Sequence, residues 1–170
     1  MIGIKSNKII LDGELYSGYI YLNGNKIVEV TNQEKECDII YDYTNKFVSA
    51  GFIETHTHGG GGYPFASDNP DDIVHGADYH LKFGTTTIAP TVSASAFEQM
   101  SKSLDAISRA KRSGKSKANI LGAHLEGPYL SKKQCGAQCP DFITPPIKSE
   151  YQSVVEKYRG DIARWTYGNV

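Results

Sequence analysis

Two histidines separated by one residue, His56 and His58, end a short apolar segment and precede the glycines at 59–62. Imidazole nitrogens are common ligands of divalent metal ions. Side chains two residues apart point to the same face of a β-strand, so these histidines can share one metal only if residues 51–58 are extended. The glycines would end such a strand, because glycine adopts backbone conformations that strain other residues. Strand histidines can also simply be hydrogen-bonded, and the spacing alone leaves both interpretations open.

A similar alternating pair, His124 and Glu126, stands at the end of a second apolar run. In a parallel α/β barrel the carboxyl ends of the strands meet at one rim, where active sites are assembled. We therefore expect His56, His58 and Glu126 to bind one divalent metal ion, with zinc the first choice and iron or another divalent ion as alternatives. Two histidines and a carboxylate leave a coordination position for water, whose pKa a metal lowers towards neutrality. This ligand set indicates hydrolysis, and we expect His124 to support or pack beside it.

The other histidines and the cysteines indicate no second site. His75 and His80 fall on a predicted helix, away from the strand ends. Cys135 and Cys139 form a C-x3-C pair, but a zinc site would need a second pair of ligands, so incidental thiols are the simpler interpretation. An odd number of cysteines without a CxxC pair is typical of a reducing, cytoplasmic compartment.

The composition is that of a soluble globular protein. Of the 170 residues, 39% are hydrophobic and 22% are charged, and the net charge is −1. This charge gives no reason to expect a nucleic acid or an anionic membrane as partner. No apolar run approaches the roughly 20 residues of a membrane span, and the first ten residues do not resemble a signal peptide.

Residues 1–48 are predicted to form a small β-sheet segment, of the kind found in β-sandwiches. The dipeptides at 12–13 and 23–24, Asp-Gly and Asn-Gly, are typical of hairpin turns. No helical periodicity precedes residue 50.

Residues 49–170 alternate between predicted strands and helices. Strands are expected at 52–58, 85–93, 119–126 and 162–167, and helices are expected to start at Asn69-Pro70, at a capping box Ser95–Glu98 and at Ser149. This order predicts a parallel α/β fold. We expect a partial (β/α)8 barrel of TIM type with about the first four strands, apparently truncated, since a complete barrel takes about 250 residues. An open doubly wound sheet fits the length better and is the alternative.

The segments GFIETHTHGGGG and LGAHLEGPYLS, followed by CGAQ, resemble the N-terminal portion of the N-acetylglucosamine-6-phosphate deacetylase family of the amidohydrolase superfamily. The HxH pair alone indicates the superfamily, whereas HLEGPY followed by a Gly-Ala-Gln turn is much more specific. The resemblance implies metal-dependent hydrolysis of N-acetylglucosamine 6-phosphate to glucosamine 6-phosphate and acetate, in amino-sugar catabolism. It implies that His56, His58 and Glu126 bind the metal and that Ala137 and Gln138 contact the sugar. The partner would be a small amino-sugar phosphate, and the family implies a homodimer.

The sequence departs from the family pattern at several points. Glu54 replaces a usual aspartate, Ala50 a usual proline, and Gln138 a frequent histidine. The family's two further histidine ligands and its catalytic aspartate lie on later strands, and those motifs do not occur in this chain. We therefore expect the 170 residues alone to be inactive. The alternatives are a non-catalytic half-barrel, either a fragment or a partner-dependent subunit, and an amidohydrolase that acts on a different amide.

Overall fold

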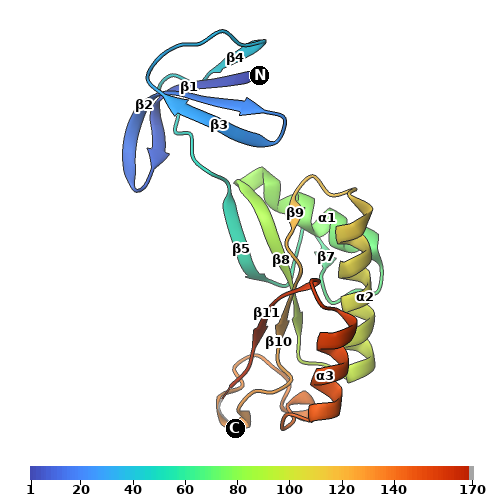
Figure 1. The fold of residues 1–170 in the computed structure, drawn as a ribbon. Coiled ribbons are helices and arrows are strands. Elements are labelled where there is room, and N and C mark those ends of the chain that lie inside the picture. Colours follow the sequence, from blue (N-terminus) through green and yellow to red (C-terminus); the bar gives the residue numbers. More distant parts are fainter. Residues whose placement is uncertain (169–170) are drawn as a thin grey trace. The chain divides into compact units, whose positions relative to one another are not determined.

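The computed structural model describes residues 1–168, and it divides the chain into two compact units at residues 50–51. The last two residues of the predicted barrel range 49–170, Asn169 and Val170, lie outside the described residues. The elements of the two units carry the labels of Figure 1. No helix within residues 1–168 is both long and apolar enough to cross a membrane.

The first unit is a four-stranded sheet in the order β3-β2-β1-β4. Its strands are β1 (Ile2–Leu11), β2 (Glu14–Asn23), β3 (Lys26–Thr31) and β4 (Ile39–Asp42). Antiparallel hairpins join β1 to β2 and β2 to β3, and β4 pairs parallel with β1. Asp12 and Gly13 both have positive φ, which is the backbone conformation that a two-residue hairpin turn requires. The hairpin turn predicted at Asp12-Gly13 is therefore present. The second hairpin also forms, but its turn residues are Gly24 and Asn25, because Asn23 still pairs with Lys26.

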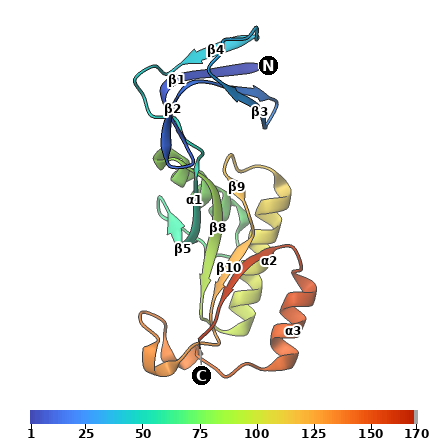
Figure 2. The ribbon, with the colours of Figure 1, turned by 60° about the vertical axis from the view of Figure 1, so that its left-hand side comes forward.

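The second unit is an α/β structure with a parallel sheet in the order β11-β10-β8-β5, to which β9 adds by pairing with β8. Its strands are β5 (Phe52–Thr57), β8 (Thr85–Ser93), β9 (Asn119–Ile120), β10 (Ala123–Glu126) and β11 (Ile162–Thr166), and a small hairpin of β6 (Gly59–Gly60) and β7 (Tyr63–Pro64) lies apart. The four main strands follow one another across the sheet in chain order, without the reversal that marks a doubly wound sheet. The helices lie on one side of this sheet (Figures 1 and 2).

The helices connect these strands. They are α1 (Pro70–His80), α2 (Phe97–Ser113) and α3 (Lys148–Lys157), with 3-10 turns at Leu81–Phe83, Lys132–Gln134 and Pro140–Phe142. The side chain of Asn69 accepts a hydrogen bond from the Asp71 N–H, as its predicted capping role requires. The α-helix ends at His80, and the 3-10 turn continues the segment to Gly84, the predicted end.

The predicted starts of the second and third helices, at the capping box Ser95–Glu98 and at Ser149, are wrong. In α2 the cap position is taken by Ala96, and in α3 it is taken by Ile147, in both cases without a side-chain hydrogen bond. Ser95 therefore lies one residue too early to cap α2, and Ser149 lies inside α3. Phe97 is the first residue of α2, and its side chain is exposed. The buried side chains of each helix pack on the core, and this packing sets where the helix begins, since a cap contributes only about 1 kcal/mol.

The core of the second unit lies between the helices and the sheet. Helix α2 contributes Met100, Leu104 and Ile107, which are buried against residues of β8 and β10 that include Val92 and Leu125. Because side chains alternate along a strand, His124 and Glu126 point to the face of the sheet opposite to Leu125. The sheet therefore buries one face under helices and keeps its polar strand-end residues on the other.

The predicted strand 119–126 is interrupted at Leu121-Gly122, so that β9 and β10 are separate. Gly122 has φ +143°, and a Cβ atom there would lie 2.8 Å from the carbonyl oxygen of Asp161. The neighbouring Ala123 N–H donates a 2.7 Å hydrogen bond to that same oxygen. The close approach of the segment before β11 thus requires glycine at this position and aligns β10, which carries Glu126.

We expect Gly122→Ala to destabilise the chain more than Gly114→Ala. Both glycines have positive φ, which costs another residue about 1 kcal/mol or more, but only Gly122 faces a backbone atom, whereas Gly114 faces open space. Urea denaturation followed by circular dichroism should give a loss of about 1 kcal/mol for Gly114→Ala and at least about 2 kcal/mol for Gly122→Ala. Equal losses would contradict the proposed role of the contact with Asp161.

Candidate metal centre

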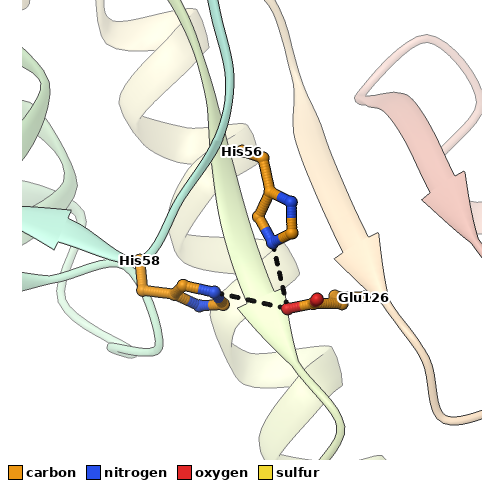
Figure 3. Close-up of side chains that lie close together, drawn as sticks. All are labelled: His56, His58 and Glu126. Carbon is orange, nitrogen blue, oxygen red and sulfur yellow. Dashed lines mark ion pairs between the residues drawn. The ribbon is translucent and has the colours of Figure 1, made fainter. Parts of the chain in front are cut away.

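Three predicted ligands, His56, His58 and Glu126, come together at the ends of β5 and β10 (Figure 3). Glu126 Oε2 lies 3.2 Å from His56 Nε2 and 3.3 Å from His58 Nε2. All three donor atoms lie within 4.8 Å of one another. Strand β8 lies between β5 and β10, so the cluster spans three neighbouring strand ends. His58 lies one residue beyond the observed end of β5, which stops at Thr57.

The donor set and its spacing fit a divalent metal ion. Zinc binds imidazole nitrogen and carboxylate oxygen at about 2.0–2.2 Å, which separates two ligand atoms of a tetrahedral site by about 3.4 Å. The observed separations between the carboxylate and the two histidines are 3.2 and 3.3 Å. Both histidine side chains are exposed and Glu126 is partly buried, so an ion can reach the cluster from solvent. A metal ion bound by all three donors would also account for their close approach, and it would do so with both histidines neutral.

The ring of His58 is oriented by Ser93, the last residue of β8. His58 Nδ1 and Ser93 Oγ are 3.0 Å apart. When Nε2 faces the cluster as a ligand, Nδ1 carries the proton, and this N–H donates a hydrogen bond to the hydroxyl oxygen, which fixes the tautomer. Ser93 is not among the residues predicted from the sequence, although its place at the end of the strand between the two ligand-bearing strands could have indicated it.

His56 is held through its backbone and through the edge of its ring. Its N–H donates a 2.8 Å hydrogen bond to Oε1 of Glu54, the residue that departs from the family's usual aspartate. Its ring packs edge to face on His124, with the ring centres 4.7 Å apart and an interplanar angle of 83°.

His124 is fully buried, and both of its ring nitrogens have protein partners. Nδ1 lies 3.0 Å from Thr91 Oγ1, and Nε2 lies 2.8 Å from Thr166 Oγ1. Burial lowers the pKa of His124 to about 4, and the positive charge of Arg164 acts in the same direction. His124 is therefore a neutral packing residue beside the cluster, with no ring nitrogen left to bind a metal.

The predicted sugar-contacting turn lies next to the cluster. The Gln138 N–H donates to the Cys135 carbonyl oxygen at 3.1 Å and so closes a four-residue turn in which Ala137 is exposed. The Gln138 side chain reaches the cluster of candidate ligands itself, because its Nε2 donates a 2.8 Å hydrogen bond to Glu126 Oε2. From the sequence, Gln138 is expected to contact only the sugar. No local sequence pattern predicts its contact with Glu126.

The remaining histidines and cysteines lie outside this cluster. His80 Nε2 is 3.0 Å from the Gly59 carbonyl oxygen and links α1 to the glycine-rich loop, while His75 is exposed and packs beside Tyr63. Cys135 and Cys139 are free thiols. Within residues 1–168, His56, His58 and Glu126 are the only group of three such side chains close enough to share an ion.

Removal of a ligand should abolish tight metal binding. We expect His56→Ala and Glu126→Gln each to weaken zinc binding by about 100-fold or more, measured by competition with a chromophoric chelator. His75→Ala serves as the matched control, because this histidine is exposed on α1 and should leave the affinity unchanged. Equal affinities for all variants would show that zinc binds elsewhere or not at all.

Loss of the hydroxyl that orients His58 should have a smaller effect. We expect Ser93→Ala to weaken zinc binding about 10-fold, since partners of a ligating histidine typically contribute 10- to 100-fold. Ser95→Ala, two residues further along the chain, is the control and should bind zinc as the unsubstituted chain does. A Ser93→Ala variant with unchanged affinity would show that the hydrogen bond to His58 does not orient a ligand.

Comparisons with known proteins give deacetylases of amino-sugar phosphates among the relatives, although no protein-family model matches the chain. An N-acetylglucosamine-6-phosphate deacetylase of Lysinibacillus sphaericus is 36% identical over 114 residues, which cover 61% of this chain and 27% of that protein. The enzyme of the same name from Caenorhabditis elegans is 28% identical over 162 residues, covering 89% of this chain and 38% of the relative. An N-acetylgalactosamine-6-phosphate deacetylase of Shewanella sp. (strain ANA-3) is 35% identical over 112 residues, which cover 65% of this chain and 28% of the relative.

Solved structures give the same result. The N-acetyl-D-glucosamine-6-phosphate deacetylase of Mycobacterium smegmatis superimposes with a TM-score of 0.86 at 26% identity, over 98% of this chain and 47% of that protein. A mutant of that enzyme, solved in complex with N-acetyl-D-glucosamine-6-phosphate, matches with a TM-score of 0.85 at 25% identity, over 98% of this chain and 43% of the mutant. The chain spans well under half the length of the curated relatives that it matches. The resemblance expected from the sequence is thus confirmed: over nearly its whole length, the chain is similar to part of the N-acetylglucosamine-6-phosphate deacetylases.

Proposed function

We propose that this chain forms part of a metal-dependent deacetylase that converts N-acetylglucosamine 6-phosphate to glucosamine 6-phosphate and acetate in amino-sugar catabolism. The observation that carries this proposal is the convergence of His56, His58 and Glu126 in a chain that superimposes on deacetylases of this name. The protein would act in the cytoplasm and, as in the family, as a homodimer.

The three side chains would hold the metal, with zinc preferred because two imidazoles and one carboxylate are a common catalytic zinc set. When bound, the ion would act as a Lewis acid and activate water for attack on an acetamide carbonyl. Ser93 would keep the His58 ring in the ligating tautomer, and the edge contact with His124 would limit rotation of the His56 ring. These contacts keep both imidazoles directed at Glu126 Oε2.

The turn of Ala137 and Gln138 would contact the sugar. Ala137 is exposed beside the cluster, so its backbone groups are open to a ligand. The Gln138 amide uses one N–H on Glu126 and retains a second N–H, which can donate to a sugar oxygen. This arrangement allows contact with the sugar and contact with the metal ligand at the same time.

The second unit would be the first half of a (β/α)8 barrel and the first unit a small β domain that precedes it. Two features support this assignment: the parallel strands follow chain order across the sheet, and the helices lie on one side of it (Figures 1 and 2). Residues 49–170 would then supply a ligand pair from the first barrel strand and a carboxylate from the third.

N-Acetylgalactosamine 6-phosphate is a second candidate substrate. Some relatives that are as similar as the glucosamine enzymes carry the galactosamine name, including the Shewanella protein at 35% identity. The two sugars differ only in the configuration at C4, so the metal centre would treat their acetamide groups alike. Any discrimination between them must come from residues that contact the sugar ring.

Substrate binding by this chain tests the proposal directly. We expect the zinc-loaded chain to bind N-acetylglucosamine 6-phosphate in isothermal titration calorimetry, and to bind it at least about 10-fold more weakly after treatment with a chelator. N-Acetylgalactosamine 6-phosphate decides between the two substrates, and unphosphorylated N-acetylglucosamine reports what the phosphate contributes. Absence of binding, or binding that does not depend on the metal, would contradict the proposed function.

Turnover is a separate expectation. We expect no release of acetate by the 170-residue chain alone, because the family's catalytic aspartate and further histidines have no counterpart in its sequence. A chain that also carries the family's later strands, with the catalytic aspartate and the further histidines, should release acetate in a metal-dependent coupled assay. Robust turnover by the 170 residues alone would show that the base lies within this chain.

A further inference from the structure

One side chain, Gln138, connects the ends of two sheet strands beside the candidate metal ligands. Its Oε1 accepts a 3.0 Å hydrogen bond from the N–H of Ala94, the residue that follows β8. Its Nε2 donates a 2.8 Å hydrogen bond to Oε2 of Glu126, the last residue of β10. The loop after β10 therefore returns to the strand ends and contacts both of them with a single amide.

The partners require one orientation of this amide. The Ala94 N–H can only donate, so it must face the amide oxygen, and an ionised carboxylate can only accept, so it must face the amide nitrogen. Both requirements are met by the same orientation of Gln138. The backbone of Gln138 is itself fixed by the hydrogen bond from its N–H to the Cys135 carbonyl oxygen.

The carboxylate oxygen that receives this hydrogen bond is the one that faces both histidines. Glu126 Oε2 lies 3.2 Å from His56 Nε2 and 3.3 Å from His58 Nε2. Among the described residues, the Glu126 carboxylate has only one polar partner besides these two histidines, and that partner is Gln138. When a metal occupies the position between the histidines and Oε2, Gln138 remains as the protein group that orients the carboxylate.

We propose that Gln138 is a positioning residue that holds Glu126 in its metal-ligating rotamer, a role that rests on the proposed metal centre. A glutamate side chain has several rotamers, and a ligand fixed in advance in one of them binds a metal more tightly. Gln138 thereby couples the order of the loop after β10 to the affinity of the site for its ion. This role is separate from contact with the sugar, which the second N–H of the amide can still make.

Gln138→Leu removes both hydrogen bonds at nearly constant volume. We expect this variant to bind zinc about 10- to 100-fold more weakly in competition with a chelator, because groups that orient metal ligands contribute this much. The visible spectrum of the cobalt-loaded chain should change as well, since it reports the ligand geometry at the metal. Gln134→Leu is the matched control, because this exposed glutamine lies in the same loop and outside the cluster.

Gln138→Glu separates positioning of the ligand from simple anchoring of the loop. Its carboxylate can still accept from the Ala94 N–H, but it places a negative charge instead of a donor against Glu126. We expect weaker zinc binding and an altered cobalt spectrum. The metal-free chain should unfold at a slightly lower temperature, because the two carboxylates repel each other. Zinc affinity and a cobalt spectrum like those of the unsubstituted chain would show that the amide only anchors the loop, and would overturn the proposal.

The outcomes also separate this inference from the proposed function. If the unsubstituted chain and both Gln138 variants bind zinc equally, the positioning role is wrong and the metal centre stands. If the unsubstituted chain binds neither zinc nor cobalt, the metal centre is wrong and the positioning role fails with it. If Gln138→Leu does not fold, Gln138→Glu decides the question.

Discussion

The parallel pairing of β8 with both β5 and β10 is the constraint on which the candidate site depends. It aligns Glu126 of β10 with Ser93 of β8, and it places Thr57 of β5 opposite Pro90. Because all three strands run in the same direction, their carboxyl ends meet at one edge, and polar residues distant in sequence become neighbours. The buried Thr91 reinforces this alignment. Its hydroxyl oxygen accepts a hydrogen bond from the Thr57 N–H of β5, and the same hydroxyl is hydrogen-bonded to Nδ1 of His124 on β10.

A single atom, Glu126 Oε2, is the centre of the cluster. Three side chains from two segments approach it: His56 and His58 from the end of β5, and Gln138 from the loop after β10. Each of these side chains is in turn fixed by a further contact, to His124, to Ser93 and to the Ala94 N–H. These contacts favour one arrangement of the carboxylate and the side chains around it, which lowers the cost of ordering the ligands when a metal binds.

The fold could be predicted from the sequence where a local pattern determines the structure. The hairpin dipeptide Asp12-Gly13, the capping residue Asn69 and the β-branched run of β8 act within a few residues, and the structure confirms each of them. The predicted capping box Ser95–Glu98 is wrong because the packing of α2, not a local cap, sets where this helix begins. The break at Gly122 could not be predicted because its cause, the carbonyl group of Asp161, lies far along the chain.

The same distinction applies to the candidate site. The convergence of His56, His58 and Glu126 could be predicted because their residue types and their places at strand ends are those of metal sites. Ser93 is not among the predicted residues, although it ends the strand between them. The contact of Gln138 with Glu126 could not be predicted, because only the fold brings this loop back to the end of β10. The contact of Gln138 also distinguishes Glu126 from the two histidines. All three residues lie at strand ends, but only the Glu126 side chain is hydrogen-bonded by the loop after β10, so its orientation depends on the order of that loop.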